Sequence, residues 1–189
     1  MEFIHEKIDM GYDDLDRAEH ADGRRYVTLD GNAYPSVTTV LSIINEEKIA
    51  AWRQKVGEEK ANQIGTQAAN RGTLVHEIIE KYLHNEDTSD YLPHIQQSLK
   101  NLKPLLDKHI TKVYATECPL YSDYLKLAGT CDCIAEWDGV PTIVDFKTSK
   151  RPKKKADIPN YFAQLAAYAV MVWLSIIRVS LWTLITFIL

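Results

Sequence analysis

The N-terminal part of the chain shows only short stretches of alternating apolar and polar residues. Residues 1–23 are polar and acidic, and we expect them to form an irregular arm. Residues 24–29 and 33–41 are rich in β-branched residues and flank Asp30-Gly31-Asn32, a pattern typical of a hairpin. We therefore expect residues 1–44 to form an arm followed by a hairpin.

After this hairpin the hydrophobic period changes to that of a helix. Apolar residues recur at steps of three and four residues, most clearly over residues 74–83. His76 and Glu80 lie four residues apart at the margin of this stripe, where side chains face the edge of a cleft rather than the core. We expect a helical lobe over residues 45–110, interrupted near Pro104.

Two strand-like runs joined by Asp138-Gly139 predict a second hairpin, because this dipeptide is a strong turn signal. If the turn has two residues, counting back along both strands places Asp132 directly opposite Asp145. The period of two places Lys147 on the same face as Asp145, further along the strand.

Two opposed carboxylates destabilise a sheet, because side chains paired across two strands lie about 5 Å apart. Ile134 and Ile143 share the face of Asp132 and Asp145, so open solvent does not explain the pair. A divalent cation does explain it, because hard ions such as Mg²⁺ bind carboxylates together with water and substrate phosphate. The sequence therefore predicts a cation site flanked by Lys147.

A basic run at residues 150–155 precedes a further helix, which we expect to begin near Asp157 with Pro159 in its first turn. Gln164 and Tyr168 share one face of this helix. We expect residues 111–175 to form the sheet and the last helix of an α/β core.

Composition narrows the class of protein. The chain has 189 residues and a formal net charge of −4, which suits one globular domain and excludes a disordered protein. Mild acidity argues against coating of nucleic acid by bulk charge, but it is compatible with a local basic groove.

The polar start predicts no secretory signal, and three cysteines suit a reducing cytosol. We expect Cys118, Cys131 and Cys133 to be buried small side chains, with no iron–sulfur cluster and no zinc site.

Five features stand in a fixed order along the chain. They are His76 in Arg71-Gly72-Thr73-Leu74-Val75-His76-Glu77, then Glu117, Gly129-Thr130-Cys131-Asp132, Asp145-Phe146-Lys147-Thr148-Ser149, and Gln164 with Tyr168. In this order they resemble the PD-(D/E)XK nuclease superfamily, specifically its RecB-like branch with the mitochondrial genome maintenance and phage exonucleases. The resemblance implies a restriction-endonuclease-like α/β core of order α-β-β-β-α-β, with a central mixed sheet flanked by helices and a helical N-terminal lobe.

The resemblance also implies metal-dependent hydrolysis of phosphodiester bonds in DNA. Mg²⁺ or Mn²⁺ would be bound by His76, Asp132, Asp145 and the backbone carbonyl of Phe146. Glu117 is a further candidate ligand, but its face depends on a strand register that the sequence does not fix. The catalytic residues implied are Asp132, Asp145, Lys147, Gln164 and Tyr168, and Lys147 would orient the attacking water.

For contacts with DNA phosphates, we expect Lys150, Arg151 and Lys153 of the basic run and Arg53 of the helical lobe. Family analogy implies single-stranded DNA with a free end, a cytoplasmic setting in a bacterial or phage-infected cell, and replication or recombination proteins as partners. A structure-selective endonuclease would share these residues. A DNA-end-binding module without turnover is the rival outside the enzymes, and the opposed carboxylates argue against it.

Each of these residues also has a plainer interpretation. A lone helical histidine such as His76 is usually structural, and a basic run is usually a solvated loop.

The chain also departs from the family near residue 175, because only Arg178 is charged after Gln164. An altered or truncated reading frame, a buried closing strand over residues 176–184 and a membrane span would each explain the apolar tail at residues 176–189, and we prefer the first.

Overall fold

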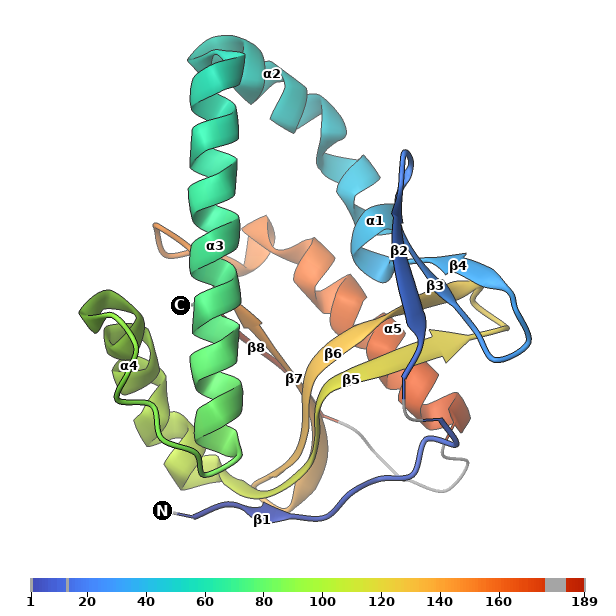
Figure 1. Cartoon of the computed structure of the whole chain (residues 1–189), viewed down its shortest axis with the longest axis vertical. Helices are drawn as coiled ribbons and strands as arrows, with labels where there is room; N and C mark the ends of the chain where they lie inside the picture. Colours follow the sequence, from blue (N-terminus) through green and yellow to red (C-terminus); the bar gives the residue numbers. More distant parts are fainter. Residues whose placement is uncertain (1, 13, 176–182, 189) are drawn as a thin grey trace.

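The protein is built around a five-stranded mixed sheet, seen here in a computed structural model that describes residues 2–12, 14–175 and 183–188 (Figure 1). The strand order is β1-β5-β6-β7-β8. An antiparallel meander of β5 (Ile110–Ser122), β6 (Leu127–Trp137) and β7 (Val140–Lys147) forms its centre, and β1 (Ile4–His5) and β8 (Thr183–Ile188) add parallel strands at the two edges. The predicted mixed α/β architecture is confirmed.

Helices cover both faces of this sheet. On one face, α3 (Glu58–Leu83) and α4 (Pro93–His109) bury apolar side chains against Val144 and Phe146 of β7. On the other, α5 (Pro159–Ser175) packs against Ile134 and Ile143. The alternation along β7 therefore separates two cores, as the period of a strand requires.

The turn between β6 and β7 has the predicted form. Asp138 and Gly139 both have positive φ, 50° and 80°, as a two-residue turn that follows the twist of its strands requires. Trp137 pairs with Val140, and the pairing continues to Cys133 opposite Val144. The predicted register of this hairpin is confirmed over these pairs.

A smaller antiparallel sheet lies beside the main one, and its strands are β2 (Asp16–His20), β3 (Gly23–Val27) and β4 (Ala33–Pro35). The predicted first hairpin is present as β3 and β4. Its second arm is shorter than predicted, because the Ser36 side chain accepts a hydrogen bond from the Thr39 N–H and starts α1 (Val37–Ser42). The predicted irregular arm was also wrong in part, since it contains β1 and β2.

The helical lobe continues from α1 through a 3₁₀ turn (Ile43–Asn45) into α2 (Glu46–Val56) and α3. The predicted interruption near Pro104 is wrong, because α4 continues through this residue to His109. Leu102 and Leu106, on either side of it, are almost fully buried, so packing holds the helix together despite the missing N–H. The division of the chain into arm, lobe, core and tail stays a prediction.

The apolar tail contributes β8, which runs parallel to β7 with Thr186 opposite Asp145. The ring of Phe187 stacks on Phe146, with centroids 6.0 Å apart, so apolar residues in this segment have partners in the core. A closing strand is therefore present over Thr183–Ile188, while residues 176–182 of the predicted strand lie outside the described residues. None of the described helices has the length and apolar character needed to cross a membrane. The reading-frame interpretation stays a prediction.

Candidate active site

A pocket of about 610 Å³ opens where α3, the main sheet and the small sheet meet. It collects residues from elements that are far apart in the sequence. Among those expected from the sequence, its lining includes His76, Glu117, Asp132, Lys147, Gln164 and Tyr168. The ordered motifs therefore converge on one cavity.

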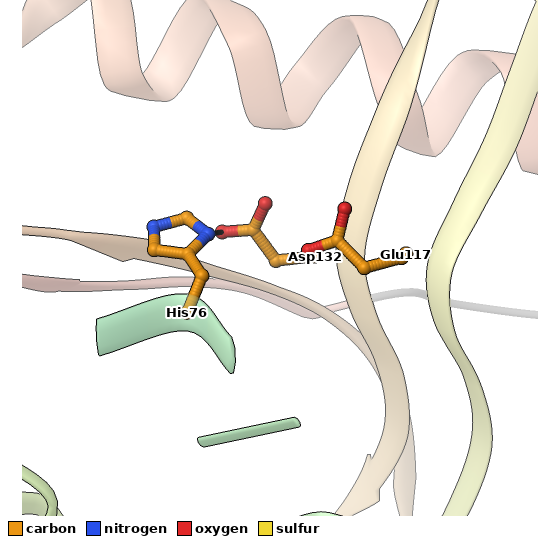
Figure 2. Close-up of side chains that lie close together, drawn as sticks. All are labelled: His76, Glu117 and Asp132. Atoms are coloured by element: carbon orange, nitrogen blue, oxygen red, sulfur yellow. Dashed lines mark ion pairs between the residues drawn. The ribbon is translucent and has the colours of Figure 1, made fainter. Parts of the chain in front are cut away.

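A potential metal-binding group lies on one side of this pocket (Figure 2). Single ligand atoms of His76, Glu117 and Asp132 lie within 4.8 Å of one another. His76 Nδ1 is 3.7 Å from Asp132 Oδ2. The group joins α3, β5 and β6, so only the packed fold assembles it.

Glu117, whose face the sequence left open, is placed by the pairing of β5 with β6. Thr116 pairs with Cys133 and Cys118 pairs with Cys131, so Glu117 falls at the position opposite Asp132. Its φ of 43° is unusual for a residue other than glycine. The sheet thus holds a second carboxylate beside Asp132 in a backbone conformation that costs free energy.

The pairs between β6 and β7 end at Cys133 opposite Val144, one residue before Asp132 and Asp145, so the direct opposition of the two carboxylates stays a prediction. The Asp132 carboxylate accepts a hydrogen bond from the Phe146 N–H at 2.6 Å. Asp145 is fully buried, and its Oδ1 accepts hydrogen bonds from Lys147 Nζ at 2.6 Å and Gln164 Nε2 at 2.9 Å. Asp145 therefore lies beside the His76 group, held by a lysine and a buried amide.

The acidic groups of the pocket repel one another. The pKa of Glu117 is raised to about 7, mainly because its carboxyl group is poorly hydrated and to a smaller extent because Asp132 and Glu80 are negatively charged. The residue as a whole is nevertheless exposed. Burial and the charge of Asp132 raise the pKa of Asp145 to about 6, against the opposing effect of Lys147. Clustered carboxyl groups with raised pKa values are typical of functional sites.

These residues fit a divalent cation. The buried Oδ2 of Asp145 has no hydrogen-bond partner among the described residues, which is costly for a carboxylate oxygen. Carboxylate oxygens are the ligands that hard cations such as Mg²⁺ and Mn²⁺ prefer. The imidazole of His76 is a ligand typical of transition-metal ions. The backbone carbonyl of Phe146 stays a predicted ligand, and the Phe146 ring lies edge-on to His76 with centroids 6.3 Å apart.

α5 closes the floor of the pocket. Gln164 and Tyr168 are both buried, and Gln164 Nε2 lies 3.4 Å from the Tyr168 hydroxyl as well as near Asp145. Tyr168 packs directly against Gly129 of β6. Gln164 therefore contacts the acidic group directly through Asp145, whereas Tyr168 contacts Gln164 and is part of the core.

Gly129→Ala is expected to destabilise the protein by about 1–3 kcal/mol, the usual cost of overpacking. The added Cβ would lie 2.7 Å from Cε1 of Tyr168 and 2.8 Å from its hydroxyl oxygen. Gly65→Ala is a matched control, because nothing lies within 4 Å of its added Cβ in α3 and alanine favours a helix by about 0.5–1 kcal/mol. Guanidinium unfolding should move the two midpoints in opposite directions, and equal midpoints would show that Tyr168 moves aside freely.

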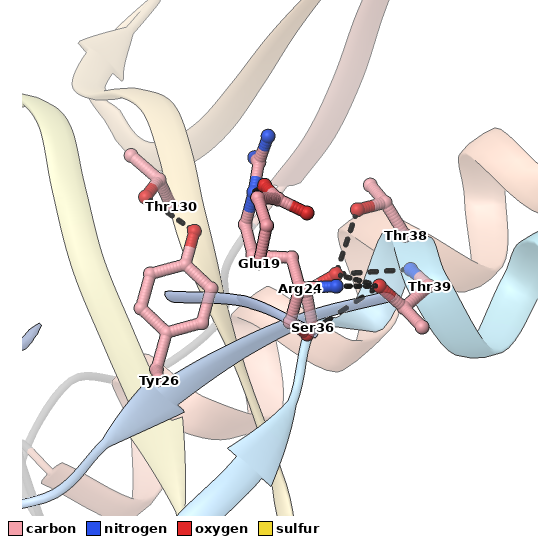
Figure 3. Close-up of polar contacts among 7 residues, drawn as sticks. All are labelled: Glu19, Arg24, Tyr26, Ser36, Thr38, Thr39 and Thr130. Carbon is pink, nitrogen blue, oxygen red and sulfur yellow. Dashed lines mark hydrogen bonds and ion pairs between the residues drawn. The ribbon is translucent and has the colours of Figure 1, made fainter. Parts of the chain in front are cut away.

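The small sheet contributes Arg17, Arg24 and Tyr26 to a polar wall of the pocket, and the sequence did not predict these three residues; Arg24 and Tyr26 are drawn in Figure 3. Ser36 and Thr38 at the start of α1 and Thr130 of β6 complete this wall. The Tyr26 hydroxyl lies 3.0 Å from Thr130 Oγ1, and Arg24 Nε donates to Glu19 Oε1 at 2.6 Å. A short polar hairpin has the pattern of a solvated surface, so only the tertiary structure identifies it as part of the site.

The predicted DNA contacts lie elsewhere on the protein. Lys150, Arg151 and Lys153 are exposed in the segment after β7. Arg53 pairs with Glu58 and also donates to Asn62 at the junction of α2 and α3. Contact of these four basic residues with DNA stays a prediction.

The cysteines are buried, as expected, and burial raises the pKa of the Cys118 thiol to about 11. Cys133 packs in the core beneath α3, whereas Cys131 packs in the core beneath α5. The strand alternation is therefore irregular around Asp132. The expectation that no iron–sulfur cluster or zinc site is present stays a prediction.

Comparison with known proteins agrees with this geometry. The sequence profile of the PD-(D/E)XK nuclease superfamily matches residues 95–178. The chain is 27% identical over 145 residues to mitochondrial genome maintenance exonuclease 1 of Homo sapiens and 27% identical over 137 residues to the protein of that name from Mus musculus. Each alignment covers 67% of this chain, which spans about 40% of the length of these relatives. The resemblance to the PD-(D/E)XK nuclease superfamily is confirmed, and the RecB-like branch stays a prediction.

Proposed function

Because the match to the PD-(D/E)XK nuclease superfamily spans the strands that carry Glu117, Asp132 and Lys147, we propose that this chain is a metal-dependent deoxyribonuclease. The observation that carries the proposal is the convergence of His76, Glu117 and Asp132 within 4.8 Å, beside the buried Asp145. Such crowding of carboxyl groups opposes folding unless a cation is bound between them.

The proposed cation, Mg²⁺ or Mn²⁺, would be held by Asp132, Asp145 and His76, with Glu117 and the carbonyl of Phe146 as further ligands. When bound, such an ion lowers the pKa of a coordinated water and polarises a phosphoryl oxygen. Its charge would also offset the repulsion that raises the pKa of Asp145 and of Glu117.

Lys147 and Gln164 have complementary roles in this proposal. Lys147 lines the pocket and is tied to Asp145, so its ammonium group would orient the attacking water and offset charge on the scissile phosphate. Gln164 fixes the carboxylate of Asp145 through a hydrogen bond from its amide, and Tyr168 in turn supports Gln164. A water so positioned would attack phosphorus and lose a proton to solvent, while the P–O bond breaks and the leaving oxygen keeps its electron pair and takes up a proton from solvent.

The proposed substrate is single-stranded DNA with a free end, and the exonuclease names of the relatives support the free end. A structure-selective endonuclease is the alternative enzyme, and a DNA-end-binding module is the alternative outside the enzymes. Association with replication or recombination proteins and a cytoplasmic setting in a bacterial or phage-infected cell remain parts of the proposal, although the relatives carry a mitochondrial name.

End-labelled linear and circular single strands, incubated with Mg²⁺, Mn²⁺ or EDTA, test this proposal. We expect the linear strand to be degraded only with metal, the circle to resist, and the label that is lost first to report the polarity. A Lys147→Ala protein prepared in parallel excludes a contaminating nuclease. Cutting of the circle would favour the endonuclease, and binding without cleavage by the wild type would favour the binding module.

A further inference from the structure

One face of the hairpin formed by β2 and β3 gathers basic and hydroxyl side chains. Arg17 pairs with Tyr26 and Glu19 pairs with Arg24 across the two strands. Since side chains alternate along a strand and paired residues point to the same side, these four share one face. Arg25, which pairs with Ala18, belongs to the opposite face.

This face is turned toward the candidate active site. Arg17, Arg24 and Tyr26 line the same pocket as His76 and Asp132. The positive charge of Arg17 also acts on the Glu117 carboxyl, which places it within electrostatic reach of the acidic group. The pocket therefore has an acidic wall on the main sheet and α3, and a second wall with cations from the small sheet and hydroxyl groups from the small sheet and the start of α1.

The two walls together suit a phosphodiester strand, whereas the acidic wall alone would repel one. Resting on the nuclease function proposed above, we propose that Arg17 and Arg24 bind a backbone phosphate of the nucleic-acid strand in this pocket. Guanidinium groups recognise phosphate through parallel hydrogen bonds, and the exposed Thr38 at the start of α1 adds a hydroxyl to the same wall. The residues act as positioning residues, because they hold the strand against the acidic groups.

Glu19 competes for Arg24 in the free protein. The carboxylate accepts a hydrogen bond from Arg24 Nε at 2.6 Å, but the exposed fractions of the side chains are 42% for Arg24 and 67% for Glu19. An exposed ion pair is weak and exchanges readily for a phosphate. Weakening this pair should therefore strengthen binding of the strand.

Binding of a labelled 20-nucleotide oligo(dT) in EDTA, followed by fluorescence anisotropy, tests the inference without cleavage or metal. Arg24→Gln and Arg17→Gln are each expected to weaken binding about tenfold and to reduce the dependence of log Kd on log salt by about one. Glu19→Gln is expected to tighten binding about threefold, since it releases Arg24.

The chain offers a matched pair of controls on the opposite face of the same hairpin. Arg25 is paired with Asp22 at 2.6 Å, so Arg25→Gln and Asp22→Asn repeat the two charge changes away from the pocket. Both should leave Kd within about twofold of the wild type. Equal effects of Arg24→Gln and Arg25→Gln, in proteins with unchanged melting temperatures, would overturn the inference, as would absence of binding by the wild type.

The outcome is separable from that of the nuclease proposal. A wild type that cleaves DNA while Arg24→Gln binds normally, with unchanged KM, would refute the phosphate site and leave the nuclease standing. A wild type that never cleaves DNA but shows the expected pattern of Kd values would refute the nuclease function and support the phosphate site.

Discussion

Lys147→Ala is expected to reduce the rate of DNA cleavage at saturating substrate and metal by about 10²–10³-fold, the usual effect of removing one group that stabilises charge in a transition state. The Lys147 ammonium lies 2.6 Å from Asp145 Oδ1 and 5.9 Å from the centre of the Tyr161 ring, and its side chain is only 23% exposed. It is thus held in place between the buried carboxylate and the open pocket.

Loss of the ammonium also removes the cation that opposes the raised pKa of Asp145. The variant should therefore melt at a lower temperature at pH 8, and its rate must be measured below that melting point. Lys150→Ala is the control, because Lys150 is exposed three residues further along and should affect KM by a few-fold at most. Retention of more than a tenth of the wild-type kcat by Lys147→Ala would contradict the catalytic role.

Saturating Mg²⁺ or Mn²⁺ is expected to raise the melting temperature at pH 8 by about 5–10 °C, because a ligand at one hundred times its Kd stabilises the folded state by about 2.7 kcal/mol. Asp132→Asn should abolish most of this shift. Asparagine can still accept the hydrogen bond from the Phe146 N–H, so the variant removes the charge and keeps the contact.

The same shift should shrink as the pH falls. The folded-state pKa values of Glu117 and Asp145, about 7 and about 6, are higher than the ordinary values of these carboxyl groups, which are 4.5 and 3.8. The metal-free folded state then binds more protons than the unfolded state, so its stability is greatest below the unfolded pKa values and is lost as pH rises through about 7. At pH 5.5 protons compete with the cation for both carboxylates.

Thermal melts at pH 5.5 and pH 8, each with Mg²⁺ and with EDTA, check this expectation. Asp138→Asn makes the same chemical change in the exposed turn between β6 and β7, where asparagine also tolerates the positive φ, and should keep the full metal shift. If neither metal changes the melting temperature of the wild type at pH 8, the result would contradict a metal site in this pocket.

The parts of the fold that the sequence predicts are those with local causes. Asp138-Gly139 sets a two-residue turn, and the period of two then fixes Trp137 opposite Val140 and puts Lys147 on the face of Asp145. The stripe on α3 places His76 at the cleft for the same reason, because helical periodicity is a property of neighbouring residues. The order of the motifs, which is also read along the chain, predicted the resemblance to the PD-(D/E)XK nuclease superfamily.

The position of Glu117 could not be counted from the sequence. β5 ends at Ser122 and β6 begins at Leu127, and the turn between them, Asp123-Tyr124-Leu125-Lys126, has no Asn-Gly or Asp-Gly pair to fix its length. Without the length of this turn, counting back along β5 cannot decide which face Glu117 takes, since a change of one residue moves every side chain to the other face. Pairing of two long strands therefore decided the third member of the metal-binding group.

The sequence by itself determined the register of the hairpin between β6 and β7 and the faces of its helices, because turn residues and hydrophobic periods act over a few residues. Only the tertiary structure decided that Arg17 and Arg24 lie in the pocket and that β8 closes the sheet beside β7. An exposed polar hairpin and a parallel edge strand leave no periodic signal of their partners. Their positions depend on packing between segments that are distant in the chain, which no local pattern encodes.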